Sequence, residues 1–152
     1  MDETPKPGEA PRAYALRMAR AKFDVVAPRH PGKTVLAADS VVAVGRRILP
    51  KAETEKEARA CLTLLSGRRH KVLGGLAVGS DGKARTRLVE SAVRFKRLEP
   101  SEIDAYIQSG EWQGKAGGYA IQGRAAAFVA FISGSYSNVV GLPLFETMAL
   151  LK

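Results

Sequence analysis

The stretch TVLAADSVVAVGRRILPKA, Thr34–Ala52, combines short apolar runs with charged residues. Two apolar runs, Val35–Ala38 and Val41–Val44, flank an acid, Asp39. Small and β-branched residues in runs this short predict a strand buried in a sheet. An ionised carboxylate is costly to bury alone, so we expect Asp39 where the strand meets a cleft, facing a cation or metal. Lys51, just after a Gly-Arg-Arg turn, is the nearest candidate for a cation that faces phosphate. The alternative is a solvated strand-end Asp39 in a surface salt bridge.

The composition limits the classes of protein to which the chain can belong. The chain has 152 residues with 45% apolar content, which fits one globular domain. A single cysteine, Cys61, excludes an internal disulfide, and with only His30 and His70 beside it there is no usual zinc ligand set. No apolar stretch approaches the roughly 20 residues of a membrane span, and the N-terminus lacks the apolar core of a signal peptide. We therefore expect a cytoplasmic protein without membrane contact.

The charge balance favours an anionic partner. Twenty-four Lys and Arg residues oppose 15 Asp and Glu residues, a formal net charge of +9. The one dense basic cluster is Arg68–Lys71, and no helix-turn-helix, zinc-finger or RNA-recognition signature surrounds it. A phosphate-rich small molecule explains the bias as well as nucleic acid does, and nucleic acid is the weaker hypothesis.

Helix and strand signals alternate along the chain. Pro11 opens a helix that carries Lys22, and Thr54–Glu57 is a capping box for a second helix ending near Ser66. Further helices are predicted at Pro100–Ser109 and Leu144–Leu151, strands at Lys71–Val78, Arg85–Arg97, Tyr119–Gln122 and Ala126–Ser133, a hairpin turn at Ser80–Lys83 and a loop at Ser135–Leu142. This order predicts an α/β domain with a mixed central sheet flanked by helices.

A glycine-rich loop, Gly110–Gly118, surrounds Lys115. It is not a P-loop, because three residues instead of four separate Gly110 from Gly114, and Ala116 replaces the Ser or Thr that would bind magnesium. Its N–H groups and Lys115 could still hold phosphate oxygens, and the alternative is a plain turn-rich loop. Serine or cysteine hydrolase chemistry is not indicated, because the chain lacks a G-x-S-x-G motif.

Several blocks together resemble one family. The order AADSVVAVGRRILPKA, LLSGRRHKV, AVRFKRL, EIDAYIQSGEWQGKAGGYAIQG and ISGSYSNVVGLPLFET is similar to that of the Maf nucleoside triphosphate pyrophosphatases. The resemblance implies a single Maf-like domain over residues 1–152, related in fold to inosine triphosphate pyrophosphatases, with two lobes around a cleft. It also implies hydrolysis of nucleoside triphosphates to monophosphate and diphosphate with a divalent metal, Mg²⁺ or Mn²⁺, and a homodimer.

The same resemblance assigns roles to residues. It implies that Asp39 is the proton acceptor and that Asp39 and Glu3 hold the metal. Ser40 and Gln122 are implied to select the base, in the branch that prefers dTTP and UTP or modified pyrimidine nucleotides. The phosphate-binding lysines are Lys22, Lys51 and Lys115.

Two departures from the family pattern qualify these expectations. Family members usually carry a strand and an S-x-S-P-R-R loop before the segment that contains Glu3, and this sequence begins at Met1 without them. The alternative function is therefore a catalytically impaired nucleotide-binding protein with a regulatory role linked to cell division. Ser40 also stands where the dTTP/UTP branch usually has Thr, which keeps the hydroxyl and loses a methyl group.

Overall fold

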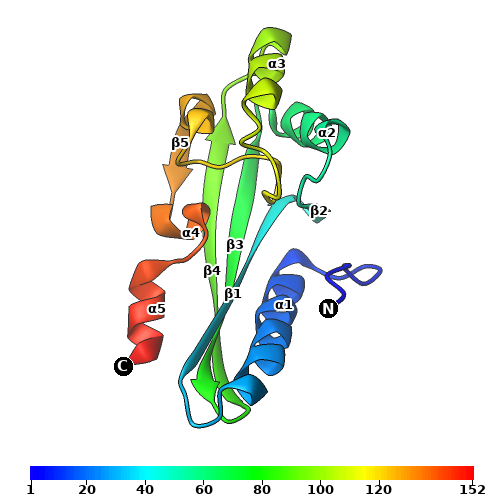
Figure 1. Ribbon diagram of the computed structural model, residues 1–152. Coiled ribbons are helices and arrows are strands. Elements are labelled where there is room, and N and C mark those ends of the chain that lie inside the picture. The colour runs from blue at the N-terminus through cyan, green and yellow to red at the C-terminus, as the bar shows by residue number, and fades with distance from the viewer.

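A five-stranded antiparallel sheet runs the length of the protein in the computed structural model, which describes residues 1–152 (Figure 1). The strands lie in the order β2-β1-β3-β4-β5. Their bounds are β1 Val35–Val44, β2 Arg47–Leu49, β3 Arg69–Ser80, β4 Lys83–Phe95 and β5 Val129–Ser133. The helices are α1 Pro11–Val26, α2 Glu55–Leu65, α3 Pro100–Ser109, α4 Tyr136–Val140 and α5 Leu144–Leu151, with 3₁₀ turns η1 Ala27–Arg29 and η2 Arg124–Phe128. The expected α/β class is confirmed.

Local signals place the ends of these elements where the sequence predicts them. Thr54 caps α2 by accepting the N–H of Glu57, and Gly110 ends α3 in the left-handed conformation. Asp81 and Gly82 both have positive φ, the geometry of a two-residue hairpin turn, and join β3 to β4. The predicted N-cap, helix stop and hairpin are therefore confirmed. The second bond of the predicted capping box is not formed, because Glu57 Oε1 accepts the N–H of Glu53 and not that of Thr54.

Adjacent glycines on β3 let helices approach the sheet from both faces. A Cβ at Gly75 would overlap the carbonyl oxygen of Ala15 on α1, and a Cβ at Gly74 would overlap the side chain of Asn138 on α4. Successive residues of a strand face opposite sides of the sheet. The α1 helix therefore covers one face, and α4 covers the other.

The apolar core is divided along the length of the sheet. One large cluster lies under α2, α3 and the loop that follows α3, and it includes Cys61, Phe95, Tyr106 and Trp112. Two smaller clusters lie between α1 and the strands. The molecule thus has the two expected lobes, which share the long strands β1 and β3.

Three expectations about the strands are wrong. The sheet is antiparallel at every pairing and not mixed, because each neighbour of β1, β3 and β4 runs in the opposite direction. Tyr119–Gln122 is irregular although Tyr119 and Ile121 are buried in alternation. The segment pairs with no strand, and the N–H of Ala120 donates to the side chain of Tyr106 instead. The predicted strand Ala126–Ser133 begins only at Val129, after a 3₁₀ turn.

The predicted loop Ser135–Leu142 contains the short helix α4. The Ser135 hydroxyl accepts the N–H of Asn138 and so caps this helix. A serine at this position is only a weak signal for the start of a helix, because serine side chains accept backbone N–H groups in turns as well. None of the helices combines the length and the apolar character that crossing a bilayer requires.

Candidate active site

Asp39 is 7% exposed and lies in the middle of β1, so the alternative of a solvated acid at the end of the strand is wrong. On one side β1 pairs with β3 from Val35 to Ala43, whereas on the other side β2 reaches only Val42–Val44. The edge of β1 beside Asp39 therefore has no strand partner, and the cleft opens there. The expectation that this carboxylate meets a cleft is confirmed, and the cleft lies along the unpaired side of β1.

A network of charged side chains surrounds Asp39. The Nζ atom of Lys22, two-thirds of the way along α1, donates to Asp39 Oδ1 at 2.6 Å and lies 3.4 Å from Glu3 Oε1. Lys51 Nζ lies 3.3 Å from the same Glu3 oxygen. Four groups far apart in the sequence thus meet at one point, which places Glu3, Lys22, Asp39 and Lys51 together as the sequence predicts.

The pKa values of this network reflect competition between burial and charge. Burial by itself would lower the pKa of Lys22, but the hydrogen bond and charge of Asp39 and the charge of Glu3 outweigh it, and the pKa of Lys22 is raised. Burial likewise opposes ionisation of Glu3, but Lys22 and Lys51 together lower its pKa. The ionised forms of Glu3 and Lys22 are therefore favoured.

Lys115 reaches the cleft on a loop that is fastened to the segment around Lys51. Lys51 and Ala116 form an isolated antiparallel bridge, Gly114 N donates to the carbonyl of Ala52 at 2.8 Å, and Ala52 N donates to the carbonyl of Lys115 at 3.0 Å. These bonds bring Lys115 to the same cleft as Lys22 and Lys51. The glycine-rich loop is therefore a fixed wall, not a free turn.

Ser40 points to the face opposite Asp39, as the next residue of a strand must. Its hydroxyl donates to the carbonyl of Gly141, after α4, at 3.4 Å. Gln122 comes from the segment after Lys115 and lines the same cleft as Ser40. The two residues implied to select the base are therefore brought to one cavity, with α4 beside them.

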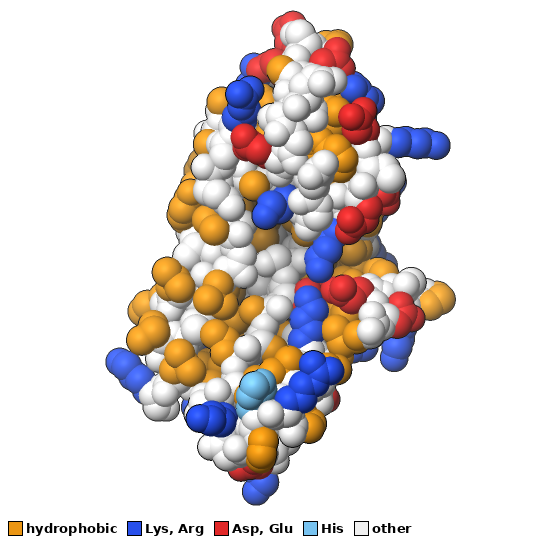
Figure 2. Space-filling model, viewed as in Figure 1, with side chains coloured by type: hydrophobic (Ala, Val, Ile, Leu, Met, Phe, Trp, Pro, Cys, Tyr) orange, Lys and Arg blue, Asp and Glu red, His pale blue; other side chains and the backbone are white.

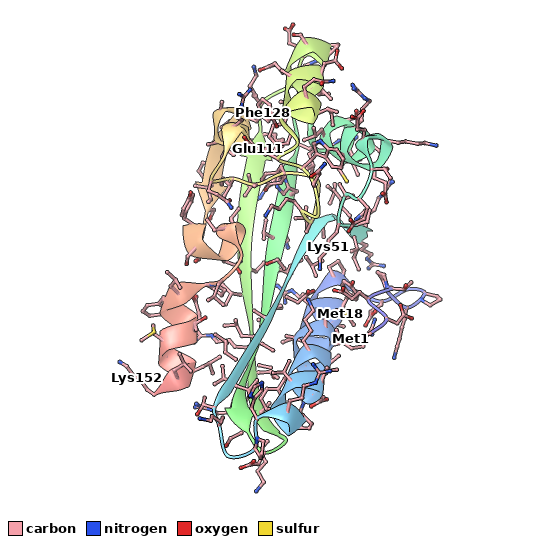
Figure 3. All side chains as sticks on the ribbon, in the orientation of Figure 1. Met1, Met18, Lys51, Glu111, Phe128 and Lys152 are labelled. Carbon is pink, nitrogen blue, oxygen red and sulfur yellow. The ribbon has the colours of Figure 1, made fainter.

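Two adjoining hollows make up the cleft. The first, about 240 Å³, is lined by Asp39, Ser40, Gln122 and the lysines Lys22, Lys51 and Lys115. The second, about 430 Å³, lies between the N-terminal segment, α1 and β2, and Asp39, Ser40, Lys51 and Ala116 border both. Figure 2 shows charged side chains gathered between α1 and the upper lobe, and Figure 3 labels Lys51 where these parts meet. Three cations around one buried acid suit a phosphate-bearing ligand.

Two carboxylates are available to a divalent metal. Glu3 and Asp39 both contact the Lys22 ammonium, so they already share one cation between them. No group of three or more His, Cys, Asp or Glu side chains could hold a metal by itself. Mg²⁺ is usually bound by one or two carboxylates, together with waters and substrate phosphates. The pair fits a metal that arrives with a phosphate ligand.

Two tyrosines of the cleft were not singled out from the sequence. Tyr14 on α1 donates its hydroxyl to the backbone carbonyl of Glu3, and Tyr119 borders the first hollow. Tyr14, Met18 and Lys22 follow one another at four-residue spacing, which puts them on one face of α1. That spacing could have identified Tyr14. Tyr119 had no such signal, because its position depends on a distant histidine, His70.

Comparison with known proteins gives a consistent family match. The Maf-like protein family matches residues 1–152. A protein of Rhodospirillum rubrum named dTTP/UTP pyrophosphatase is 63% identical over 152 residues, which cover 99% of this chain and 72% of that protein. Relatives with the same name from Caulobacter vibrioides and Paramagnetospirillum magneticum are 61% and 62% identical, and the matches cover 79% and 80% of their lengths.

Proposed function

The chain belongs to the Maf family, and we propose that it is a hydrolase that cleaves nucleoside triphosphates, dTTP and UTP above all, to nucleoside monophosphate and diphosphate. The observation that carries the proposal is the buried Asp39 at a cleft lined by three lysines. The shared name of relatives at about 60% identity supports the same reaction and favours it over a binding protein without turnover.

The lysines bind and orient the triphosphate. Lys51 and Lys115 come from two segments joined by backbone hydrogen bonds, so their charges stand on a rigid support for phosphate oxygens. Lys22 is held by Asp39 and Glu3, and an incoming phosphate competes for its ammonium. Fixed cations in a cleft stabilise the negative charge that develops on the departing diphosphate.

Asp39 is the proton acceptor. Water that attacks the α-phosphorus must lose a proton, and a carboxylate oxygen within hydrogen-bond reach can take it. Asp39 Oδ1 holds Lys22 at 2.6 Å, so transfer of Lys22 to a phosphate frees this oxygen for the water. A divalent metal, Mg²⁺ or Mn²⁺, held by Glu3 and Asp39 with the phosphates would supply further charge neutralisation.

Gln122 and Ser40 select the base. An amide offers both a donor and an acceptor to the edge of a pyrimidine ring, and a hydroxyl adds one of each. Both line the first hollow, and Ser40 already contacts the carbonyl of Gly141 beside it.

The nucleotide substrate, which is a cytoplasmic metabolite, also supports a cytoplasmic location for this chain.

The test is diphosphate release from dTTP, UTP, CTP and GTP with Mg²⁺ or Mn²⁺. We expect Asp39→Asn to lower kcat by ~10²–10⁴-fold, because the amide cannot accept the proton. Asp24→Asn is the matched control, since Asp24 is an exposed acid on α1 paired with Arg20. If Asp39→Asn keeps full activity, the assignment is wrong. Nucleotide-dependent thermal stabilisation without any diphosphate release would instead favour the binding protein.

A further inference from the structure

Gln122 stands on a segment without regular structure. Residues 111–123 form successive turns between α3 and η2, and the one ladder contact within them is the bridge at Ala116. A side chain on a strand or helix is positioned by the regular backbone hydrogen bonds of that element. On this segment the position of Gln122 depends on hydrogen bonds from the residues on either side of it.

The side before Gln122 is fastened to the upper lobe by two tyrosines. The Tyr119 hydroxyl lies 2.6 Å from Nε2 of the buried His70 on β3. The Tyr106 hydroxyl on α3 accepts the N–H of Ala120 at 3.1 Å. Residues 119 and 120 are therefore fixed to the sheet and to a helix.

On the side after Gln122, the one side chain that holds the backbone is Glu111, which adds to the local turn bonds from Gly123 N–H to the carbonyl of Ala120 and from Ala126 N–H to the carbonyl of Gly123. Its Oε1 atom accepts the backbone N–H of Arg124 at 2.9 Å, and Oε2 lies 3.8 Å from the Arg124 guanidinium. A Cβ on Gly123 would overlap the same Oε1 atom, so the carboxylate packs directly against the backbone next to Gln122. Figure 3 labels Glu111 and Phe128, the last residue of η2, in the upper lobe.

We propose that Glu111 is a positioning residue that fixes Gln122 in the cleft and thereby sets how strongly the site discriminates between pyrimidine and purine bases. The inference rests on the proposed function, because it assumes that Gln122 contacts the base. Glu111 itself does not line either hollow, so it acts through the backbone of Gly123 and Arg124 and not by touching the nucleotide.

Two substitutions separate the acceptor from the charge. In Glu111→Ala the N–H of Arg124 loses its acceptor, and the backbone after Gln122 keeps only the local turn hydrogen bonds of Gly123 and Ala126. Glu111→Gln keeps a carbonyl oxygen that accepts the same N–H and removes only the negative charge. Glu55→Ala, at an exposed acid in the first turn of α2, is the control for loss of a carboxylate elsewhere.

The experiment measures dissociation constants for the non-hydrolysable α,β-imido analogues of dTTP and GTP and for inorganic tripolyphosphate. We expect Glu111→Ala to reduce the dTTP-to-GTP preference about fivefold or more, the effect of one lost hydrogen bond. Affinity for tripolyphosphate should remain within about twofold, because the three lysines keep their places. Glu111→Gln should restore the preference, and hydrogen exchange at the Arg124 amide should accelerate in Glu111→Ala alone.

The outcomes separate this inference from the proposed reaction. An unchanged preference in Glu111→Ala overturns the positioning role, and so does an equal loss of affinity for tripolyphosphate, which would indicate general destabilisation. A wild-type chain that binds both analogues equally also overturns it. Binding does not require turnover, so a chain that releases no diphosphate refutes the proposed reaction and leaves these ratios measurable.

Discussion

Lys22 contacts both carboxylates of the cleft, Asp39 and Glu3, and so determines the charge state at its centre. Asp39 is almost fully buried, and the ammonium is its only hydrogen-bond partner by side chain. Leaving a buried carboxylate without its partner is destabilising, whereas loss of an exposed ion pair has little effect. This lysine therefore couples stability of the fold to the chemistry of the site.

We expect Lys22→Met to lower kcat/KM for dTTP by ~10²-fold, because a phosphate loses one cation and Asp39 loses its partner. The melting temperature should also fall, while Lys22→Arg should retain most of the stability. Steady-state kinetics and thermal unfolding measure the two effects. Lys56→Met, on exposed α2 surface, should leave both unchanged, and equal behaviour of the two methionine variants would contradict the assignment.

His70 gives the fold a pH dependence. It is 1% exposed, and burial lowers its pKa to about 4 from the ordinary 6.5. The unfolded chain binds a proton near pH 6.5 that the folded chain binds only near pH 4. The stability from this residue is therefore complete above pH 6.5 and is lost as the pH falls from 6.5 to 4, by about 3 kcal/mol in all.

Replacement of the buried histidine by a neutral amide removes that titration. We expect the unfolding free energy of His70→Gln to depend less steeply on pH between 6.5 and 4 than that of the wild type. Urea unfolding at several pH values across this range measures the slope. His30→Gln, at an exposed histidine, is the control and should keep the wild-type slope. Equal slopes in all three proteins would exclude the assignment to His70.

Among the α-helices, α4 is the shortest and yet is firmly fixed. Asn138 is fully buried, and its Nδ2 donates to the carbonyls of Val72 and Val89 and to the hydroxyl of Ser91. One side chain thus links α4 to both central strands, β3 and β4. The next residues of α4, Val139 and Val140, border the first hollow, so this anchor also holds one wall of the cleft.

We expect Asn138→Asp to destabilise the fold by about 3 kcal/mol or more, because a buried carboxylate replaces the donor and faces two carbonyl oxygens. Urea unfolding measures the change in free energy. Gln108→Glu makes the same amide-to-acid exchange on the exposed surface of α3, and should change the free energy by less than about 0.5 kcal/mol. A comparably small change in Asn138→Asp would show that the anchor is dispensable.

At the scale of the whole molecule, an apolar surface lies on α4, α5 and β5, here called the α4–α5 face. It presents the exposed side chains of Phe131, Tyr136, Val140, Leu144, Phe145, Met148 and Leu151, and Figure 2 shows apolar side chains gathered over α5 at the lower left. No charged residue occurs from Ala125 to Phe145, although the chain carries a net charge of +9. This part of the chain therefore adds no charge to the face that would repel a second copy, and a stable dimer buries about 800 Å² on each partner.

We propose a homodimer through the α4–α5 face and expect Phe145→Glu to give monomers. Phe145 is 79% exposed, so the substitution should leave the fold intact while it buries a charge in the interface. Light scattering coupled to size exclusion measures the mass. Val25→Glu, at an exposed apolar residue on α1, should remain dimeric. A monomeric wild-type chain at high concentration would refute the proposal.

Local sequence signals were enough to predict the boundaries of several elements. Pro11, Thr54, Gly110 and the Asp81–Gly82 turn each define a boundary through hydrogen bonds and backbone preferences within a few neighbouring residues. The order of the motif blocks also predicted the family and the residues expected around the cleft. These features depend on short-range energies or on residue identity, so they could be predicted without coordinates.

The way in which distant residues meet depends instead on the tertiary structure. It places Asp39 beside an unpaired strand edge, joins Lys22 to Glu3, and fixes the segment of Gln122 through His70, Tyr106 and Glu111. Strand direction and the Tyr119–Gln122 segment were predicted wrongly for the same reason. Each depends on which partner a backbone or buried polar group finds across the fold, and packing of the two lobes determines that choice.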